Sequence, residues 1–136
     1  MVAEPWHRLA ISAPLVVTGR WLGGTPDPVW WRRLDRGGGQ VIEQATHLYD
    51  LGRLLAGEAT VVAASSTRGR AIDDGADVAD GTSAILRYDS GAIGAFVNSR
   101  RAPSAAVELT VVADGVRATI RRTAADHPGD WETAIG

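Results

Sequence analysis

The 136-residue sequence predicts an α+β fold, an open and mainly antiparallel β-sheet of five to seven strands with one main helix packed on one face. One long segment has helical apolar spacing, and several short runs rich in β-branched residues are separated by turn sequences. Strands and helices do not alternate as they do in βαβ folds. Because the length and composition are those of one ordinary globular domain, residues 1–136 are expected to form a single domain.

The first expected strand and the helix come early in the chain. The run SAPLVVTGRWLGG, residues 12–24, has the composition of a strand and stops at a Gly-Gly pair before a turn-rich loop. Residues 40–56 have helical apolar spacing, and Gly57 stands where a left-handed C-cap residue is usual. The following ATVVAASS, residues 59–66, is typical of a buried strand. Residues 68–81, rich in aspartate and glycine, then predict a polar loop or edge hairpin.

Two hairpins are expected after this loop. TSAILRY and AIGAFVNS are separated by Asp-Ser-Gly, and VELTVVA and VRATI are separated by Asp114-Gly115, the strongest short hairpin signal in the chain. Residues 122–136 show no periodicity, so we expect a tail that is partly flexible or docks through Trp131.

The composition excludes several classes of function. The chain has no cysteine and no lysine, which excludes disulfides, thiolate chemistry, sulfur-ligated zinc and a Schiff-base lysine. The net charge is −2 and acidic residues interrupt the arginines, so no nucleic-acid partner is expected. There is neither an apolar run of roughly 20 residues nor a signal-peptide pattern, so we expect no membrane association and a cytoplasmic location.

The segment 40–56 places three ionisable side chains on one face of the expected helix. Glu43, His47 and Asp50 cluster opposite the apolar residues, with spacings of i, i+4 and i, i+3 that allow neighbouring side chains to meet. The opposite, core-facing side is formed by Val41, Ala45, Leu48, Gly52 and Leu55. A carboxylate beside an imidazole makes an acid/base unit. The alternatives are a solvated surface with weak ion pairs and a metal site.

Three consecutive glycines, Gly37, Gly38 and Gly39, precede this helix. Glycine permits close approach of the backbone to a ligand or to another chain, and a plain flexible connector is the alternative.

The order of these motifs resembles the C-terminal domain of the Gfo/Idh/MocA oxidoreductases. Trp30-Trp31-Arg32 is followed by the three glycines, an acid, His47 and an aspartate, and then by LLAGE and a β-run. The later DGTSAILRYDSGAIGAF is similar to the strand, turn and strand that follow the helix in that family. The similarity extends over residues 15–120.

This resemblance implies roles for individual residues. His47 would be the catalytic histidine that exchanges a proton with the substrate hydroxyl or carbonyl during hydride transfer. Glu43, where most members have aspartate, would support that proton transfer and bind substrate, whereas Asp50 would be a structural partner on the helix. The substrate would be a small molecule, bound with the help of Trp21, Trp30, Trp31, Arg32, Gly37, Gly38 and Gly39.

Members of the family also hold NAD(P) in an N-terminal Rossmann domain that ends in a catalytic lysine. This chain has no lysine and no G-x-G-x-x-G between a strand and a helix. We therefore expect no cofactor to be bound by this chain alone, and NAD(P) only if another chain supplies a Rossmann domain.

Three functions remain open from the sequence. The chain could be the substrate-binding and oligomerisation domain of an NAD(P)-dependent oxidoreductase, either as a fragment of it or with a Rossmann-domain partner chain. It could be a stand-alone non-redox lyase, isomerase or cyclase that uses Glu43 and His47 as acid and base. It could also be a non-catalytic dimeric binding module. The resemblance implies a homodimer through the sheet face in all three cases.

Other ionisable residues are assigned plain roles. We expect His7 and His127 on the surface, and a solvated loop at the aspartates of the segment 68–81, because their spacing does not match an EF-hand. Those aspartates are Asp73, Asp74, Asp77 and Asp80. Arg87, Arg100 and Arg101 would line the sheet face or bind an acidic group of the substrate.

Overall fold

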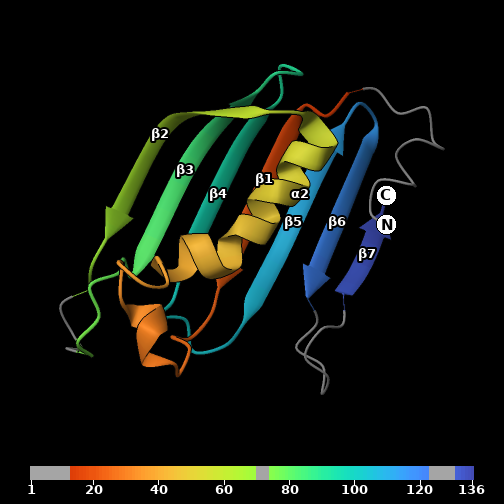
Figure 1. The fold of residues 1–136 in the computed structure, drawn as a ribbon. Helices are drawn as coiled ribbons and strands as arrows, with labels where there is room; N and C mark the ends of the chain where they lie inside the picture. The colour runs from red at the N-terminus through yellow and green to blue at the C-terminus, as the bar shows by residue number, and fades with distance from the viewer. Residues whose placement is uncertain (1–12, 70–73, 123–130) are drawn as a thin grey trace.

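The computed structural model describes residues 13–69, 74–122 and 131–136, and it confirms the α+β class (Figure 1). Seven strands form one sheet in the order β2-β3-β4-β1-β5-β6-β7. The strands are β1 (Val16–Leu22), β2 (Ala59–Thr67), β3 (Gly81–Tyr88), β4 (Ile93–Ser99), β5 (Ala106–Ala113), β6 (Val116–Arg122) and β7 (Trp131–Ile135). His7, His127 and Asp73 lie outside the described residues.

The first strand occupies the middle of the sheet. β1 pairs in parallel with β4 and antiparallel with β5, and every other strand contact among the described residues is antiparallel. Both expected hairpins are present, since β3 pairs with β4 and β5 pairs with β6 across Asp114-Gly115, where Gly115 has a φ of 71°. In the tail, Trp131–Ile135 forms β7 and pairs with β6.

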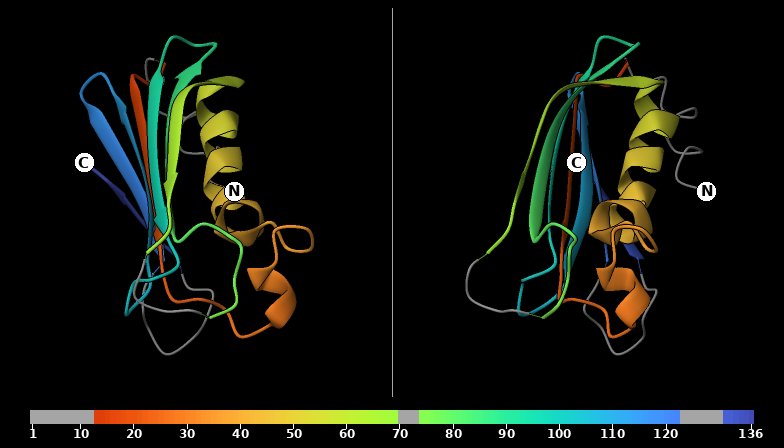
Figure 2. Two further views of the ribbon diagram at one scale, coloured as in Figure 1. Left: turned by 90° about the vertical axis from the view of Figure 1, so that its left-hand side faces the viewer. Right: turned by 60° about the vertical axis from the view of Figure 1, so that its left-hand side comes forward.

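A single helical segment covers the centre of one sheet face and leaves the other face open (Figure 2). A 3-10 turn, η1 (Val29–Arg32), precedes it, and its own first turn is a π-helix, η2 (Val41–Ala45), which continues into α2 (Thr46–Ala56). The helix ends at Gly57, which has a φ of 91°, as the sequence predicts. Among the described residues, no helix is long and apolar enough to cross a membrane.

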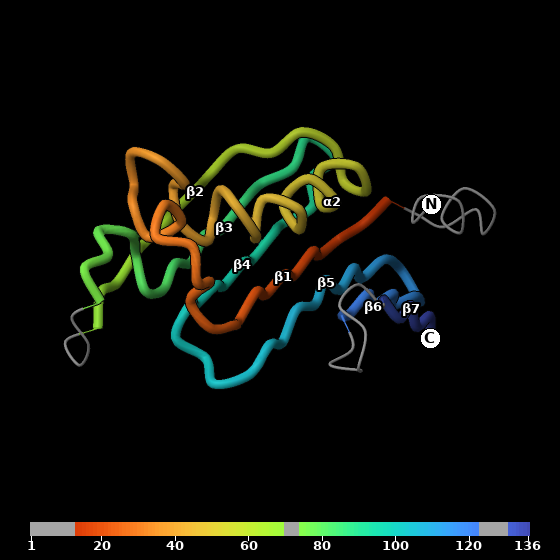
Figure 3. The backbone as a smooth tube through the Cα atoms, turned by 60° about the horizontal axis from the view of Figure 1, so that its bottom comes forward, coloured from red at the N-terminus to blue at the C-terminus, as the bar shows by residue number. Residues whose placement is uncertain are grey.

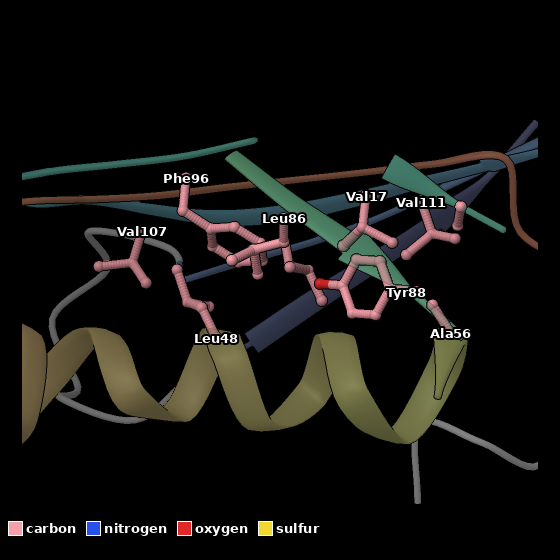
Figure 4. Packing of buried hydrophobic residues seen from close by; sticks show 10 residues of the cluster. Val17, Leu48, Ala56, Leu86, Tyr88, Phe96, Val107 and Val111 are labelled. Carbon is pink, nitrogen blue, oxygen red and sulfur yellow. The ribbon is translucent and has the colours of Figure 1, made fainter. Parts of the chain in front are cut away.

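The core lies between α2 and the central strands (Figure 4). Leu48 is fully buried and packs with Phe96, Leu109, Val17 and Val111, which confirms the predicted core face of the helix. Each such side chain contributes about 1.5–3 kcal/mol through the apolar area removed from water.

Two glycines set how closely helix and sheet approach. A Cβ on Gly52 of α2 would lie 2.5 Å from the Tyr88 hydroxyl oxygen, and a Cβ on Gly19 of β1 would overlap the ring of Phe96. Larger residues at either position would force the two layers apart.

The prediction of a buried strand at residues 59–66 is right in secondary structure and wrong in burial. β2 is an end strand of the sheet, and all its residues after Ala59 are exposed. The helix does not extend far enough across the sheet to cover β2, so apolar composition alone did not determine burial (Figure 3).

The packing at Gly52 can be tested by Gly52→Ala. Alanine has the better helix propensity by about 1 kcal/mol, yet its methyl group would collide with the Tyr88 hydroxyl. We expect the free energy of unfolding in urea to fall by about 1–3 kcal/mol. Leu54→Ala, on the exposed side of the same helix, should change it by less than about 0.5 kcal/mol. Equal or greater stability of Gly52→Ala would contradict the close packing.

Candidate functional site

Glu43 and His47 lie on the helix and are exposed, as the sequence predicts. The His47 ring lies beside the indole of Trp21 on β1, with the ring centroids 6.2 Å apart and the planes inclined by 38°. Neither ionisable side chain makes a hydrogen bond or ion pair with another described residue. Both remain available to a ligand.

Asp50 belongs to a different set of contacts. Arg53 Nη1 lies 3.3 Å from Asp50 Oδ1, and Arg53 Nη2 lies 2.7 Å from Glu58 Oε1. Asp50 therefore pairs along the helix with Arg53, the structural role expected of it.

The π-helical turn affects where Glu43 lies relative to His47. Glu43 belongs to η2, whereas His47 belongs to the regular α-helix that follows. A π turn holds more residues per turn than an α turn, so residues four apart across this junction lie more nearly above one another. Single π turns are frequent at functional sites.

The structure explains why positions 37–39 are glycines, which the sequence alone did not. Gly38 and Gly39 have φ values of 71° and 73°, which residues with a side chain adopt rarely. A Cβ on Gly39 would lie 2.8 Å from Val78 Cβ, and a Cβ on Gly37 would lie 3.0 Å from Trp31 Cα. The glycine segment is therefore packed against the protein's own side chains.

The residues of the Trp-Trp-Arg motif differ in exposure. Trp30 is 47% exposed and Trp31 is 3% exposed, so within this pair Trp30 is the one open to a ligand. Trp31 Nε1 and Arg32 Nε are buried without a hydrogen-bond partner. Trp21, half-buried, joins the core from β1 and contacts His47.

A buried ion-pair cluster fixes the segment that leads to the helix. The Arg100 side chain is 2% exposed, and its Nη1 and Nη2 atoms lie 2.6 Å from Asp74 Oδ2 and 2.5 Å from Asp80 Oδ1. Arg100 Nη1 also donates to Thr25 Oγ1 at 2.8 Å, and Arg101 Nε donates to Asp80 Oδ1 at 3.0 Å. The end of β4 thus joins two loops that are distant in the sequence.

This cluster corrects two sequence-based predictions. Asp74 and Asp80 do not belong to a solvated loop, and Arg100 is not available to bind an acidic substrate, because these residues satisfy one another inside the protein. The adjacent Gln40, at the start of the helix, donates from Nε2 to the Ser99 carbonyl oxygen at 2.8 Å. β4 therefore positions the start of the helix that carries Glu43 and His47.

An apolar groove of about 530 Å³ lies beside the helix, over β2 and β3. Val41, Tyr49, Val61, Ala64 and Ala84 are among its lining residues, none of which is charged.

Tyr49 lies at the boundary between the groove and the core, and its ring stacks on Phe96 with the ring centroids 4.4 Å apart. Burial raises the pKa of the Tyr49 hydroxyl, and a hydrogen bond with Asn98 partly offsets this rise. The groove could not be predicted from the sequence, because its walls come from separate elements.

The described glycine segment, residues 37–39, does not have the form of a Rossmann dinucleotide turn. A Rossmann dinucleotide site has a glycine turn between a strand and a helix whose backbone amides are open to the pyrophosphate. Here the glycines follow a 3-10 turn, and the space beside them is filled by Trp30, Trp31, Ile42 and Val78. Within residues 13–69, 74–122 and 131–136, no three His, Asp or Glu side chains gather to bind a metal.

Comparisons with known proteins agree with this fold. The model of the GFO/IDH/MocA C-terminal domain matches residues 9–131. Levoglucosan dehydrogenase in complex with NADH is similar in structure, with a TM-score of 0.73 and 20% identity over 98% of this chain and 42% of that one. WlbA dehydrogenase from Bordetella pertussis, in complex with NADH and UDP-GlcNAcA, has a TM-score of 0.76 and 19% identity over 97% and 41% of the two chains.

A third similar structure is KijD10, a 3-ketoreductase from Actinomadura kijaniata in complex with NADP, with a TM-score of 0.71 and 15% identity. The matched region is 98% of this chain and 44% of KijD10. The chain therefore spans less than half the length of each of these three enzymes. No curated protein matches the chain.

The ion pairs of Arg100 predict a specific dependence of stability on pH. The hydrogen bond from Arg100 lowers the pKa of the Asp74 carboxyl from 3.8 to about 2. A carboxyl whose pKa is lower in the folded state stabilises the protein above its unfolded-state pKa, and this contribution is lost as pH falls through the folded-state value. As the pH falls from 3.8 to about 2, the free energy of unfolding of the wild type should therefore decrease.

Asp74→Asn is the matched variant, because asparagine keeps the shape and does not titrate. We expect it to be less stable at neutral pH and to show a shallower decrease over the same acid range. Asp27→Asn, at an exposed loop position, serves as the control and should follow the wild type. Identical acid profiles for Asp74→Asn and the wild type would contradict the assignment.

Proposed function

The chain belongs to the GFO/IDH/MocA C-terminal domain family, and from this premise we propose that it is the substrate-binding and oligomerisation domain of an NAD(P)-dependent oxidoreductase. The observation that carries the proposal is the pair Glu43 and His47, exposed on the helix and engaged in no ion pair with other described residues. Side chains four residues apart on one helix face can contact the same bound substrate, and a carboxylate with an imidazole can move a proton to or from it.

His47 and Glu43 would act as the proton-transfer pair. When a substrate alcohol is oxidised, the hydroxyl proton passes to the His47 imidazole as the C–H hydrogen leaves as hydride, and the reverse reaction returns that proton to the carbonyl oxygen. Glu43 would hold the same hydroxyl or orient the imidazole. NAD(P) would supply the hydride acceptor, and a Rossmann domain outside these 136 residues would hold it.

A polyhydroxylated small molecule suits the surroundings of His47. The indole of Trp21 lies beside the imidazole, and the exposed Trp30 belongs to the segment before the helix. Aromatic rings offer flat apolar faces beside polar groups, which suits the mixed surface of a sugar ring. The names of similar enzymes, which include levoglucosan and UDP-GlcNAcA, support this class of substrate.

We also propose a homodimer through the open sheet face. Ile85, Ile93 and Val97 are each about half exposed on that face, on neighbouring strands. Exposed apolar patches on a sheet commonly mark an interface between subunits.

The requirement for a separate cofactor domain can be tested by calorimetric titration of the purified chain with NADH and NADPH. We expect no binding tighter than about 1 mM, because the glycine segment is occupied by the protein's own side chains. Saturable binding of either dinucleotide would contradict this and place a nicotinamide site within the 136 residues.

The catalytic pair can be tested in the complete oxidoreductase, with its cofactor-binding domain present. We expect His47→Ala to lower kcat by about 100-fold or more and Glu43→Gln to lower it by about 10-fold. Thr46→Ala, at the exposed position between them, is the control and should leave kcat within about twofold.

Unchanged kcat in His47→Ala would refute the proton-transfer role. Turnover of a substrate by the chain alone that needs no dinucleotide and is lost in both variants would instead support the non-redox lyase, isomerase or cyclase. Substrate binding without any turnover in the assembled protein would support the binding module.

A further inference from the structure

β2 is an unusual end strand. It runs from Ala59 to Thr67, and its sequence ATVVAASST contains no charged residue and no proline. All its residues after Ala59 are exposed, including Val61 at 59% and Val62 at 56%. Since β2 pairs only with β3, the backbone groups along its other edge have no partner among the described residues.

Such an edge normally carries protection against pairing with other chains. Proteins place charges, proline or bulges on end strands, or cover them. The opposite end strand, β7, is five residues long and carries Glu132, whose carboxylate lies 3.1 Å from Arg121 Nε. β2 has only one such feature, a shift of register between Val61 and Ala63.

We propose that β2 is an interaction surface for a second copy of this chain, with the two β2 strands paired antiparallel about a two-fold axis. Residues 63–67 form the regular part beyond the bulge, where each residue pairs in order with β3. A two-fold axis perpendicular to the sheet relates antiparallel neighbours, so both α2 helices lie on the same side. Seven strands from each copy form one continuous sheet.

The strand is compatible with itself in this arrangement. With the axis at Ser65, Ser65 lies opposite Ser65, Ala64 opposite Ser66, and Ala63 opposite Thr67. Small and hydroxyl-bearing residues pair across antiparallel strands without steric or electrostatic conflict. No like charges meet, although each copy carries a net charge of −2. A second copy therefore satisfies the free backbone groups without electrostatic cost at the contact.

Pairing also has a consequence for the groove beside α2. Its floor includes Val61, Ala64 and Ser66 of β2, and the groove reaches the edge of the sheet. A second β2 extends this floor on the same face, so the two grooves join into one trough between the two helices. The interface is distinct from the open sheet face, where Val97 lies.

Two substitutions separate the two interfaces in sedimentation velocity experiments. Ser65→Lys places two positive charges directly opposite each other across the β2 pair, and Val97→Arg puts a charge into the open sheet face. Because two different two-fold interfaces join at least four copies, we expect the wild type to sediment as a tetramer or larger, each single variant as a dimer through its remaining interface, and the double variant as a monomer. Thr133→Lys on β7 is the control for a charge on an end strand and should sediment as the wild type does.

A charge-reversal experiment distinguishes loss of the β2 contact from misfolding of the variants. In the Val97→Arg background, Ser65→Lys and Ser65→Glu should each be monomeric, and an equimolar mixture should form a dimer with an affinity at least about tenfold tighter than either alone. In the same background with Ser65 intact, hydrogen exchange of the amides of residues 63–67 should slow at least about tenfold as protein concentration rises into the dimeric range.

Each outcome decides between the interfaces. A monomeric Val97→Arg variant whose β2 amides exchange at the same rate at all concentrations would overturn the β2 proposal and leave the sheet-face dimer standing. A dimeric Val97→Arg variant that Ser65→Lys dissociates would support the β2 interface. Sedimentation of Val97→Arg identical to that of the wild type, with dissociation by Ser65→Lys alone, would support β2 and refute the sheet-face dimer.

Discussion

The contact of one helix with the centre of the sheet is the constraint on which the other features depend. Gly52 on the helix and Gly19 on β1 allow close approach, and Leu48 fills the space against Phe96. A helix is about 10–12 Å wide with its side chains, and the buried cluster beneath it draws on β1, β3, β4 and β5. The central strands are therefore buried on that face, whereas β2 stays exposed.

The position of this helix is set at its start by the end of β4. Gln40 is held by the Ser99 carbonyl, and Arg100 joins Asp74, Asp80 and Thr25. Breaking such a buried pair by removing one partner costs about 3–5 kcal/mol, because an unpaired charge is left inside. The cluster thus fixes the loops around the glycine segment, while Glu43 and His47 take no part in it. Stability and the proposed chemistry are therefore carried by separate ionisable groups.

Because the helix covers only part of the sheet, several apolar surfaces of the sheet remain exposed. The groove over β2 and β3, the exposed valines of β2 and the apolar patch at Ile85, Ile93 and Val97 all lie beyond the helix or on the opposite face. Contiguous exposed apolar residues of this kind commonly mark interaction surfaces. One proposed interface is therefore β2 itself, and the other lies on β3 and β4.

The sequence by itself determined the local elements, because they depend on neighbouring residues. Helical spacing with Gly57, the Asp114-Gly115 turn and the acid-His-Asp face on the helix were all predictable, since each is a short-range pattern. Only the tertiary structure decided that the first strand lies at the centre of the sheet, that β2 is exposed, and that Arg100 is paired with Asp74 and Asp80. These facts depend on contacts between residues far apart in the chain, and identical local composition is compatible with either outcome. The glycine segment shows the same limit, because its packing against Val78 cannot be read from residues 37–39 alone.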